Sequence, residues 1–79
     1  MFPVTILEEI SQIQVPPRLS VLEAVAFKQT VQELCQNDST PSLIIIDFSQ
    51  TTFMDSSGLG ALVTNFKIAQ AKGIKLILR

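Results

Sequence analysis

The most constraining feature of this sequence is its run of aliphatic residues at Leu43–Ile46. The run has the length of a strand and lacks the alternating polar residues of a strand with one solvated face. Such a pattern favours a strand that is covered on both faces, as in the middle of a parallel sheet. We therefore predict a central, parallel strand here, with the other elements arranged around it.

Three further stretches are predicted as strands. Val4–Leu7 and Ile10–Val15 are short and mainly apolar, and the second alternates apolar and polar residues at Ile13–Val15. Pro16–Pro17 ends this second strand, because proline cannot donate a hydrogen bond to a strand ladder. Ile74–Leu78 is predicted as the last strand of the chain.

The first helix is predicted to begin at Ser20, which forms a capping box with Glu23 three residues later. It ends near Gln36 and is followed by a polar loop over residues 37–41. Its residues divide into two faces by their spacing. The stripe predicted to face the core is Ala24, Phe27, Val31 and Leu34, and the residues predicted to face water are Lys28, Gln32 and Glu33.

The second helix is predicted to follow Asp55–Ser57, whose side chains are typical of a helix N-cap. Gly73, directly after Lys72, is typical of the residue that ends a helix. The order β-β-α-β-α-β predicts one small α/β domain over residues 1–79, with a mixed, mainly parallel sheet and helices packed against it. The apolar positions at helical spacing in this second helix are Leu59, Leu62, Val63 and Phe66.

The composition limits the partners that the chain can have. A chain of 79 residues supports one small core. Its hydrophobic fraction of 47% and mean hydropathy of +0.39 are high for that size, which predicts self-association. The formal net charge is -1 and no basic run is present, so nucleic acid is not expected as a partner.

The chain also lacks the residues that common catalytic and metal sites use. It contains no histidine and one cysteine, which argues against intramolecular disulfides, ordinary zinc sites and histidine-based catalysis. Cys35 is predicted to be a small, buried, apolar residue on a helix. Glu8 and Glu9 interrupt the first apolar stretch, so no signal peptide is expected. No window approaches the roughly 20 apolar residues of a membrane span, and a cytoplasmic location is expected.

The segment Phe53–Gly60 joins a strand to a helix through the residues Asp-Ser-Ser-Gly. This order places two hydroxyl groups at a helix N-terminus and at the carboxyl edge of a sheet, where open α/β folds have their sites. Free N–H groups and the helix dipole favour an anion there. Two interpretations stay open from the spacing alone. In one the loop is a functional site; in the other Ser56 and Ser57 only cap the helix, while Gly58 and Gly60 only allow close packing.

Two known motifs that use similar residues are excluded. A P-loop requires Gly-Lys followed by Ser or Thr, and no such sequence follows the glycines. A hydrolase nucleophile elbow requires a glycine two residues before the serine and a histidine partner. Met54 occupies the first of these places before Ser56, and the chain has no histidine. We therefore expect no enzyme activity and no catalytic residue in this loop.

At these residues the sequence resembles the STAS domain, a family of bacterial anti-sigma-factor antagonists that have an Asp-Ser-Ser-Gly-Leu-Gly loop after a hydrophobic strand. The resemblance covers the strand Leu43–Phe48, the loop Phe53–Gly60, the helix to Lys72 and the strand from Ile74, and extends more weakly back to Ile13. It implies a protein-binding module. Some members of the family are thought to bind a nucleotide, but this sequence shows no dedicated base or ribose contacts, so no cofactor is predicted.

The resemblance also implies a role for each residue of the loop. Ser56, directly after Asp55, is implied to be phosphorylated by a partner that is both a serine kinase and an anti-sigma factor. The unmodified domain would sequester that partner and free the sigma factor. Phosphorylation would end the binding until a serine phosphatase removes the group. The partner-binding residues implied in this way are Asp55, Ser56, Ser57, Gly58 and Leu59.

Two departures from the family pattern lead to further expectations. Many antagonists carry an acidic residue before the first helix, and Ser20 stands at that place here. Family members also usually continue past the strand at Ile74 with a helix, a strand and a helix. Without these elements we expect exposed apolar surface and a homodimer or strand-exchanged assembly. The alternative function is a STAS-like oligomerisation or scaffold module that is not phosphorylated.

Overall fold

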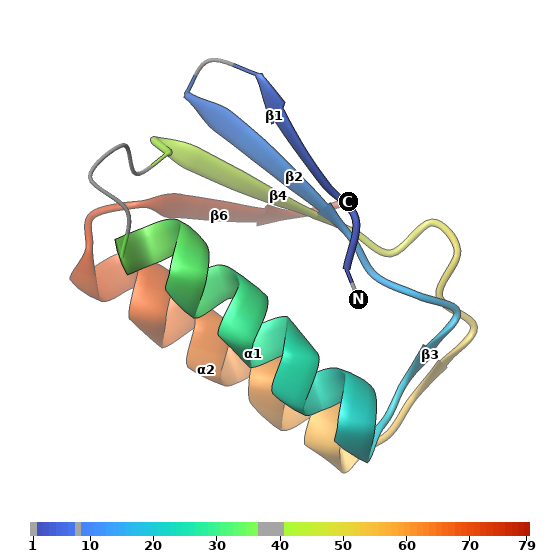
Figure 1. Cartoon of the computed structure of the whole chain (residues 1–79). Coiled ribbons are helices and arrows are strands. Elements are labelled where there is room, and N and C mark those ends of the chain that lie inside the picture. Colours follow the sequence, from blue (N-terminus) through green and yellow to red (C-terminus); the bar gives the residue numbers. More distant parts are fainter. Residues whose placement is uncertain (1, 8, 37–40) are drawn as a thin grey trace.

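The computed structural model describes residues 2–7, 9–36 and 41–79 (Figure 1). Its element order contains the predicted order β-β-α-β-α-β, and two short strands are added to it. Residues 37–40 of the predicted polar loop lie outside the described residues. The elements are β1 (Val4–Leu7), β2 (Ile10–Gln14), β3 (Arg18–Leu19), α1 (Val21–Gln36), β4 (Leu43–Asp47), β5 (Phe53–Met54), α2 (Ser56–Ala71) and β6 (Lys75–Leu78).

The main sheet has four strands in the order β1-β2-β4-β6. β1 is antiparallel to β2, whereas β2, β4 and β6 run parallel to one another. Ile44 of β4 lies between Ser11 of β2 and Leu76 of β6 in the register. The predicted mixed, mainly parallel sheet is confirmed, and the aliphatic run at Leu43–Ile46 does form a central parallel strand.

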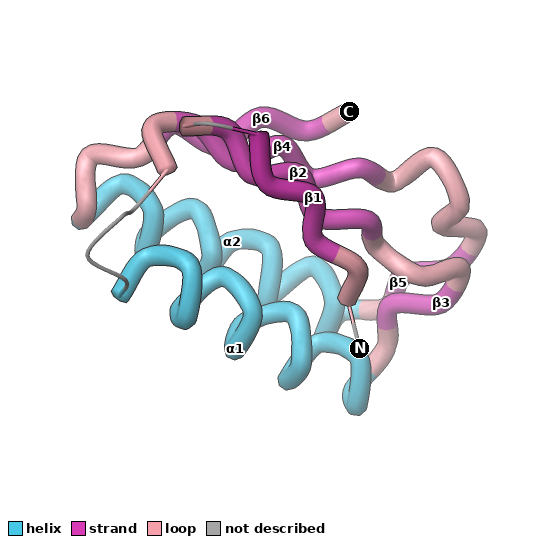
Figure 2. The backbone as a smooth tube through the Cα atoms, turned by 45° about the horizontal axis from the view of Figure 1, so that its top comes forward, coloured by secondary structure: helices cyan, strands magenta, loops and turns pink. Residues whose placement is uncertain are grey.

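Both helices lie on one face of this sheet, as Figure 2 shows, and no described element covers the other face. The prediction that β4 is covered on both faces is therefore wrong. Ile44 and Ile46 point toward the helices and are fully buried, whereas Leu43 and Ile45 are only half-buried on the open face. The aliphatic run thus indicates a strand that is paired on both edges. It does not show that helices cover both faces of the sheet.

The first helix starts after Ser20 and packs as predicted, but only half of the predicted capping box forms among the described residues. Glu23 accepts from the Ser20 N–H, whereas the Ser20 hydroxyl donates to Glu23 and does not cap the Glu23 N–H. The backbone N–H and the hydroxyl of Ser20 both donate to Glu23 Oε1, at 3.0 and 2.7 Å. The hydrogen bond from the Ser20 hydroxyl is the main reason that the pKa of Glu23 lies below its ordinary value of 4.5. Ala24, Phe27 and Val31 are buried, and Leu34 packs partly buried against the same core.

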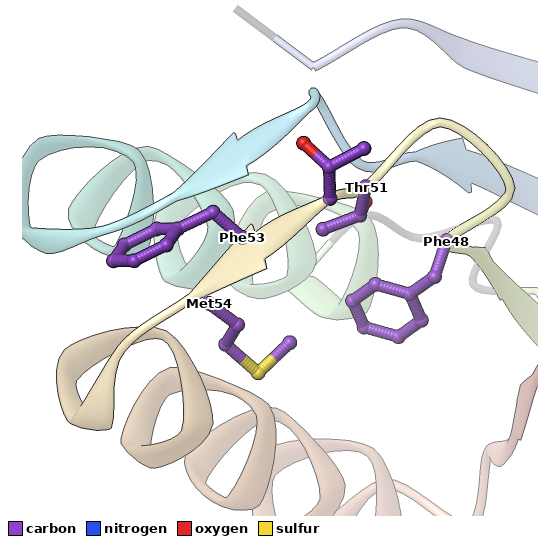
Figure 3. A pocket seen from close by; sticks show the side chains of 5 residues that line it. Phe48, Thr51, Phe53 and Met54 are labelled. Carbon is purple, nitrogen blue, oxygen red and sulfur yellow. The ribbon is translucent and has the colours of Figure 1, made fainter.

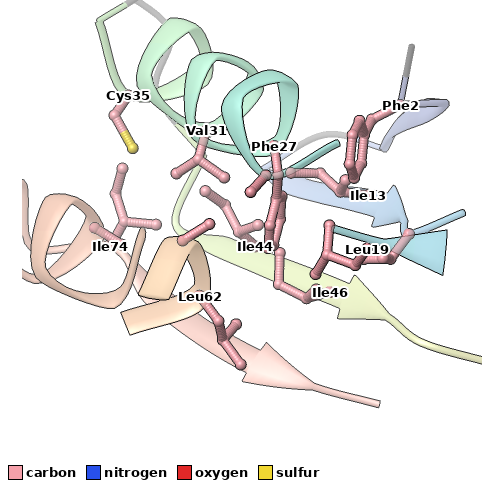
Figure 4. Packing of buried hydrophobic residues seen from close by; sticks show 14 residues of the cluster. Phe2, Ile13, Leu19, Phe27, Val31, Cys35, Ile44, Ile46, Leu62 and Ile74 are labelled. Carbon is pink, nitrogen blue, oxygen red and sulfur yellow. The ribbon is translucent and has the colours of Figure 1, made fainter. Parts of the chain in front are cut away.

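The core lies between the two helices and the sheet (Figure 4). The rings of Phe2 and Phe27 stack with their centroids 5.3 Å apart, which ties the N-terminal segment to α1. Cys35 is buried at the far end of α1, as predicted. Burial raises the pKa of its thiol.

The second helix buries a different face from the one that its apolar residues suggest. Leu62 is buried, but Leu59, Val63 and Phe66 remain 55%, 48% and 39% exposed. Asn65 is fully buried, and its side chain makes no hydrogen bond within the described residues. Small side chains allow the helix to approach α1 and the sheet closely. The buried residues of α2 are Gly58, Ala61, Leu62, Asn65 and Ala69.

Candidate functional site

The loop before α2 is held in place by the two short strands that the sequence did not predict. β3 pairs with β5 in parallel, with Arg18 opposite Phe53 and Leu19 opposite Met54. The guanidinium carbon of Arg18 lies 4.5 Å from the centre of the Phe53 ring, within cation–π distance. The Asp55 N–H donates to the carbonyl oxygen of Leu19 at 3.3 Å. These contacts fix the backbone that enters α2.

Asp55 is the N-cap of α2. Its backbone is extended, with φ -102 and ψ -172, and its Oδ1 accepts a hydrogen bond from the Gly58 N–H at 3.0 Å. Ser56 is therefore the first residue of the helix and Ser57 the second. Within the described residues neither hydroxyl takes part in a hydrogen bond that holds the fold. Because Asp55 is the cap, the interpretation that Ser56 and Ser57 only cap the helix is wrong.

Gly58 and Gly60 differ in their surroundings. A Cβ atom on Gly58 would lie 2.5 Å from the carbonyl oxygen of Leu19 and 2.9 Å from the side chains of Leu19 and Met54. Apart from its chain neighbours and the backbone of its own helix, Gly60 has no atom within 4 Å of the place where its Cβ would be. The predicted close approach is therefore confirmed for Gly58 only, and this approach sets the start of α2 against β3 and β5.

The five predicted partner-binding residues are adjacent in the fold but are not equally accessible. Ser56 and Leu59 are exposed, Asp55 and Ser57 are half-buried, and Gly58 is buried. Only Ser56 and Leu59 are therefore exposed to a partner. Gly58 is buried and contributes by its close contact with Leu19, not by offering a side chain to a partner.

Sequence reasoning missed a shallow apolar hollow next to the loop (Figure 3). It has a volume of about 310 Å³, and β5 forms one side of it. The two phenylalanines that flank the Thr51–Thr52 pair are the signal that could have indicated it. The lining residues are Phe48, Thr51, Thr52, Phe53 and Met54.

The described residues contain neither a metal site nor a membrane-spanning helix. Histidine, cysteine and carboxylate side chains form no group of three that could hold a metal ion. Neither helix in the described part of the chain has the length and apolar character needed to cross a membrane.

The comparison with protein families matches residues 2–79 to the STAS domain. None of the curated protein sequences matches the chain. The fold itself is shared with solved structures of low sequence identity. The phosphorylated form of SpoIIAA, a Bacillus cell fate determinant, has a TM-score of 0.81 at 22% identity, over 99% of this chain and 70% of that one. The unphosphorylated form of the anti-sigma factor antagonist SpoIIAA has a TM-score of 0.82 at 22% identity, over 99% and 71%.

Two other similar structures show the range of proteins that contain this fold. The STAS domain of an antisigma-factor antagonist from Rhodobacter sphaeroides has a TM-score of 0.77 at 13% identity, over 99% of this chain and 83% of that one. The murine anion transporter Slc26a9 has a TM-score of 0.74 at 22% identity, over 91% of this chain and 12% of that one. The same domain fold thus occurs in small regulators and as a minor part of a transporter.

Proposed function

Because this chain belongs to the STAS domain family, we propose that it is an anti-sigma-factor antagonist switched by phosphorylation of Ser56. Its partner is an anti-sigma factor that is also a serine kinase, and a serine phosphatase restores the unmodified form. The domain acts by binding in the cytoplasm and does not catalyse a reaction. The observation that carries this proposal is that Ser56 is exposed in the first turn of α2 while Asp55 does the capping.

The position of Ser56 allows modification without unfolding the helix. Since Asp55 satisfies the Gly58 N–H, a phosphate on Ser56 replaces no hydrogen bond that holds the fold. The first turn of a helix favours negative charge because its N–H groups and dipole are oriented toward it. The domain can therefore carry the phosphate as a folded protein.

The same phosphate opposes binding of a partner. It adds about -1.5 to -2 charge at neutral pH, next to the carboxylate of Asp55. A partner that covers Ser56 would have to remove water from that charge, which costs more than covering a hydroxyl group. Leu59, exposed one turn further along, provides the apolar contact of the unmodified surface. We expect the shallow hollow beside β5 to lie within the same interface.

The test is to compare variants of Ser56 in binding to the anti-sigma kinase. Ser56→Asp should raise the Kd at least tenfold, because a carboxylate mimics part of the phosphate charge. Ser56→Ala should bind within about twofold of the native chain and should accept no phosphate, as peptide mass spectrometry would show. Gln29→Glu adds a charge on the exposed face of α1 and serves as the control. Equal affinities of the Asp and Ala variants would refute the switch.

The second candidate function is a scaffold module that binds its partners without phosphorylation. The observation in its favour is Ser20, which stands where many antagonists have an acid and whose hydroxyl is already bonded to Glu23. The Slc26a9 match shows that this fold also occurs inside larger proteins. The same titration separates the two functions, since a scaffold would bind Ser56→Asp and Ser56→Ala equally well and would receive no phosphate from the kinase.

A further inference from the structure

Arg18 is the only basic residue in the two segments that lead into the helices. These segments, residues 16–24 and 51–59, also contain the acidic residues Glu23 and Asp55. Figures 1 and 2 show β3 and β5 side by side at the end of the molecule where both helices begin. A charge that is added to Ser56 is therefore added beside a single guanidinium group.

The backbone of β3 brings Arg18 close to Ser56. The carbonyl oxygen of Leu19, the next residue after Arg18, accepts a hydrogen bond from the Asp55 N–H at 3.3 Å. The same oxygen lies 2.5 Å from the place that a Cβ on Gly58 would occupy. Leu19 thus contacts residues on both sides of Ser56, and Arg18 is one residue away from these contacts.

In the unmodified chain the guanidinium of Arg18 lies over the ring of Phe53, with its carbon atom 4.5 Å from the ring centre. Arg18 is exposed and Phe53 is 43% exposed, so this cation–π contact is weak. Phe53, seen in Figure 3 on β5, precedes Ser56 by three residues, which span at most about 11 Å. A change of side-chain rotamer therefore brings the guanidinium within reach of a group on Ser56.

The two acidic side chains in these segments already have hydrogen-bond donors. Glu23 accepts from the N–H and the hydroxyl of Ser20, and Asp55 caps α2. The bonds from Ser20 are the main cause of the lowered pKa of Glu23, and the charge of Arg18 is the smallest cause. Neither carboxylate replaces Phe53 as the contact of Arg18.

We propose that Arg18 leaves Phe53 and binds the phosphate when Ser56 is phosphorylated. This inference rests on the proposed function, because it concerns the phosphorylated form of the same site. A guanidinium donates two parallel hydrogen bonds to a phosphate, and such a charged contact is stronger than an exposed cation–π contact. Arg18 also offsets the repulsion between the phosphate and the carboxylate of Asp55.

The exchange changes the surface that the partner is expected to cover. Phe53 lines the shallow hollow beside β5, and its ring loses the guanidinium that lies over it. The pair of phosphate and guanidinium must still lose water when a partner covers it, so the modification continues to oppose binding. Arg18 thus couples a modification at the start of α2 to the surface of β5.

The first test measures the ionisation of the phosphate by ³¹P NMR titration. Phosphoserine is incorporated at position 56 of the full chain during its synthesis, so that no kinase is needed. The second pKa of phosphoserine is about 6, and a nearby cation lowers it by favouring the doubly charged form. This pKa should be at least about 0.5 higher in Arg18→Gln than in the native background. Arg18→Lys should lie between the two, because lysine keeps the charge but lacks the planar fork.

Lys67→Gln is the matched control for this titration. It removes a positive charge from an exposed position on α2, three turns and about 16 Å from Ser56. Since this distance exceeds the Debye length at physiological salt, the phosphate pKa should not change. Circular dichroism confirms that each variant is folded. Equal phosphate pKa values in the native background and in Arg18→Gln would overturn the proposal.

A second measurement follows the Arg18 side chain itself. In the unmodified chain the ring current of Phe53 should shift the proton signals of this side chain, and phosphoserine at position 56 should remove the shift. Phe53→Leu should lack the shift without phosphate and should keep the low phosphate pKa. Arg18 signals that do not respond to the phosphate would also overturn the proposal. Neither measurement uses a kinase, so a kinase that fails to modify Ser56 would refute the proposed function and leave this result unchanged.

Discussion

Gly58 and Gly60 lie two residues apart in the same helix, but only Gly58 occupies a position where a side chain would clash. The backbone of Leu19 lies so close to Gly58 that a side chain there cannot be accommodated without moving β3. A carbonyl oxygen in a paired strand cannot turn away as the end of a flexible side chain can. Gly60 faces open space, so the helix does not require a glycine at that position.

We therefore expect opposite effects from two equal substitutions. Gly58→Ala should lower the free energy of unfolding by about 1–3 kcal/mol, because the added methyl group overpacks the contact with Leu19. Gly60→Ala should raise it by roughly 0.5–1 kcal/mol, because alanine loses less backbone entropy in a helix. Urea denaturation of both variants measures the difference. Two variants of equal stability would contradict the close contact at Gly58.

At the scale of the element, the start of α1 depends on a single carboxylate. Glu23 accepts hydrogen bonds from both the backbone and the hydroxyl of Ser20, and these bonds hold the pKa of Glu23 below its ordinary value. A group whose pKa is lower in the folded state stabilises the fold above its unfolded pKa. That contribution is lost as the pH falls through the lower, folded pKa.

The pH dependence of stability should show this loss. The contribution of Glu23 is complete above its unfolded pKa of 4.5 and should disappear as the pH falls through its lower pKa in the folded state. Glu23→Gln should be less stable than the native chain at pH 7 and should lose less stability on acidification. Asp47, whose pKa is lowered mainly by the Ser49 N–H, keeps part of the slope. Urea midpoints between pH 2 and pH 7 measure the effect, with the exposed Glu33→Gln as control. An unchanged slope in Glu23→Gln would contradict it.

At the scale of the whole molecule, two helices cover one face of a four-stranded sheet, and large apolar side chains remain exposed on several surfaces. They occur on β1, on both helices and on β6, and the most exposed of them is Leu22 of α1. Apolar surface of this extent agrees with the self-association that the composition predicts.

Thermal stability should depend on concentration if the chain associates with itself, as its composition predicts. Dimerisation stabilises the folded chain by mass action, so the Tm should rise by a few degrees between about 5 and 500 µM. Differential scanning calorimetry measures this shift. A native Tm that is constant over the same range would contradict self-association.

Much of the fold could be predicted because its signals are local. Proline ends β2, the Ser20–Glu23 pair begins α1, and Gly73 ends α2 with a φ of 72. Each signal involves residues within one turn of one another, so it can be identified without knowing what the element packs against. The two-residue strands β3 and β5 were missed because they are too short to show a period and exist only through pairing with each other.

The sequence by itself determined where the two helices and the four strands of the main sheet lie, and it indicated the loop that carries the candidate site, because capping, turn chemistry and apolar spacing act between near neighbours. Only the tertiary structure decided that Asp55 caps α2, that Gly58 is fixed by Leu19, and that Asn65 faces inward while Phe66 faces outward. These outcomes depend on contacts between residues far apart in the chain. Close packing against α1 buries the face of α2 that carries small side chains and leaves the face with Leu59, Val63 and Phe66 exposed. The helical spacing of apolar residues does not reveal how closely a second helix will pack.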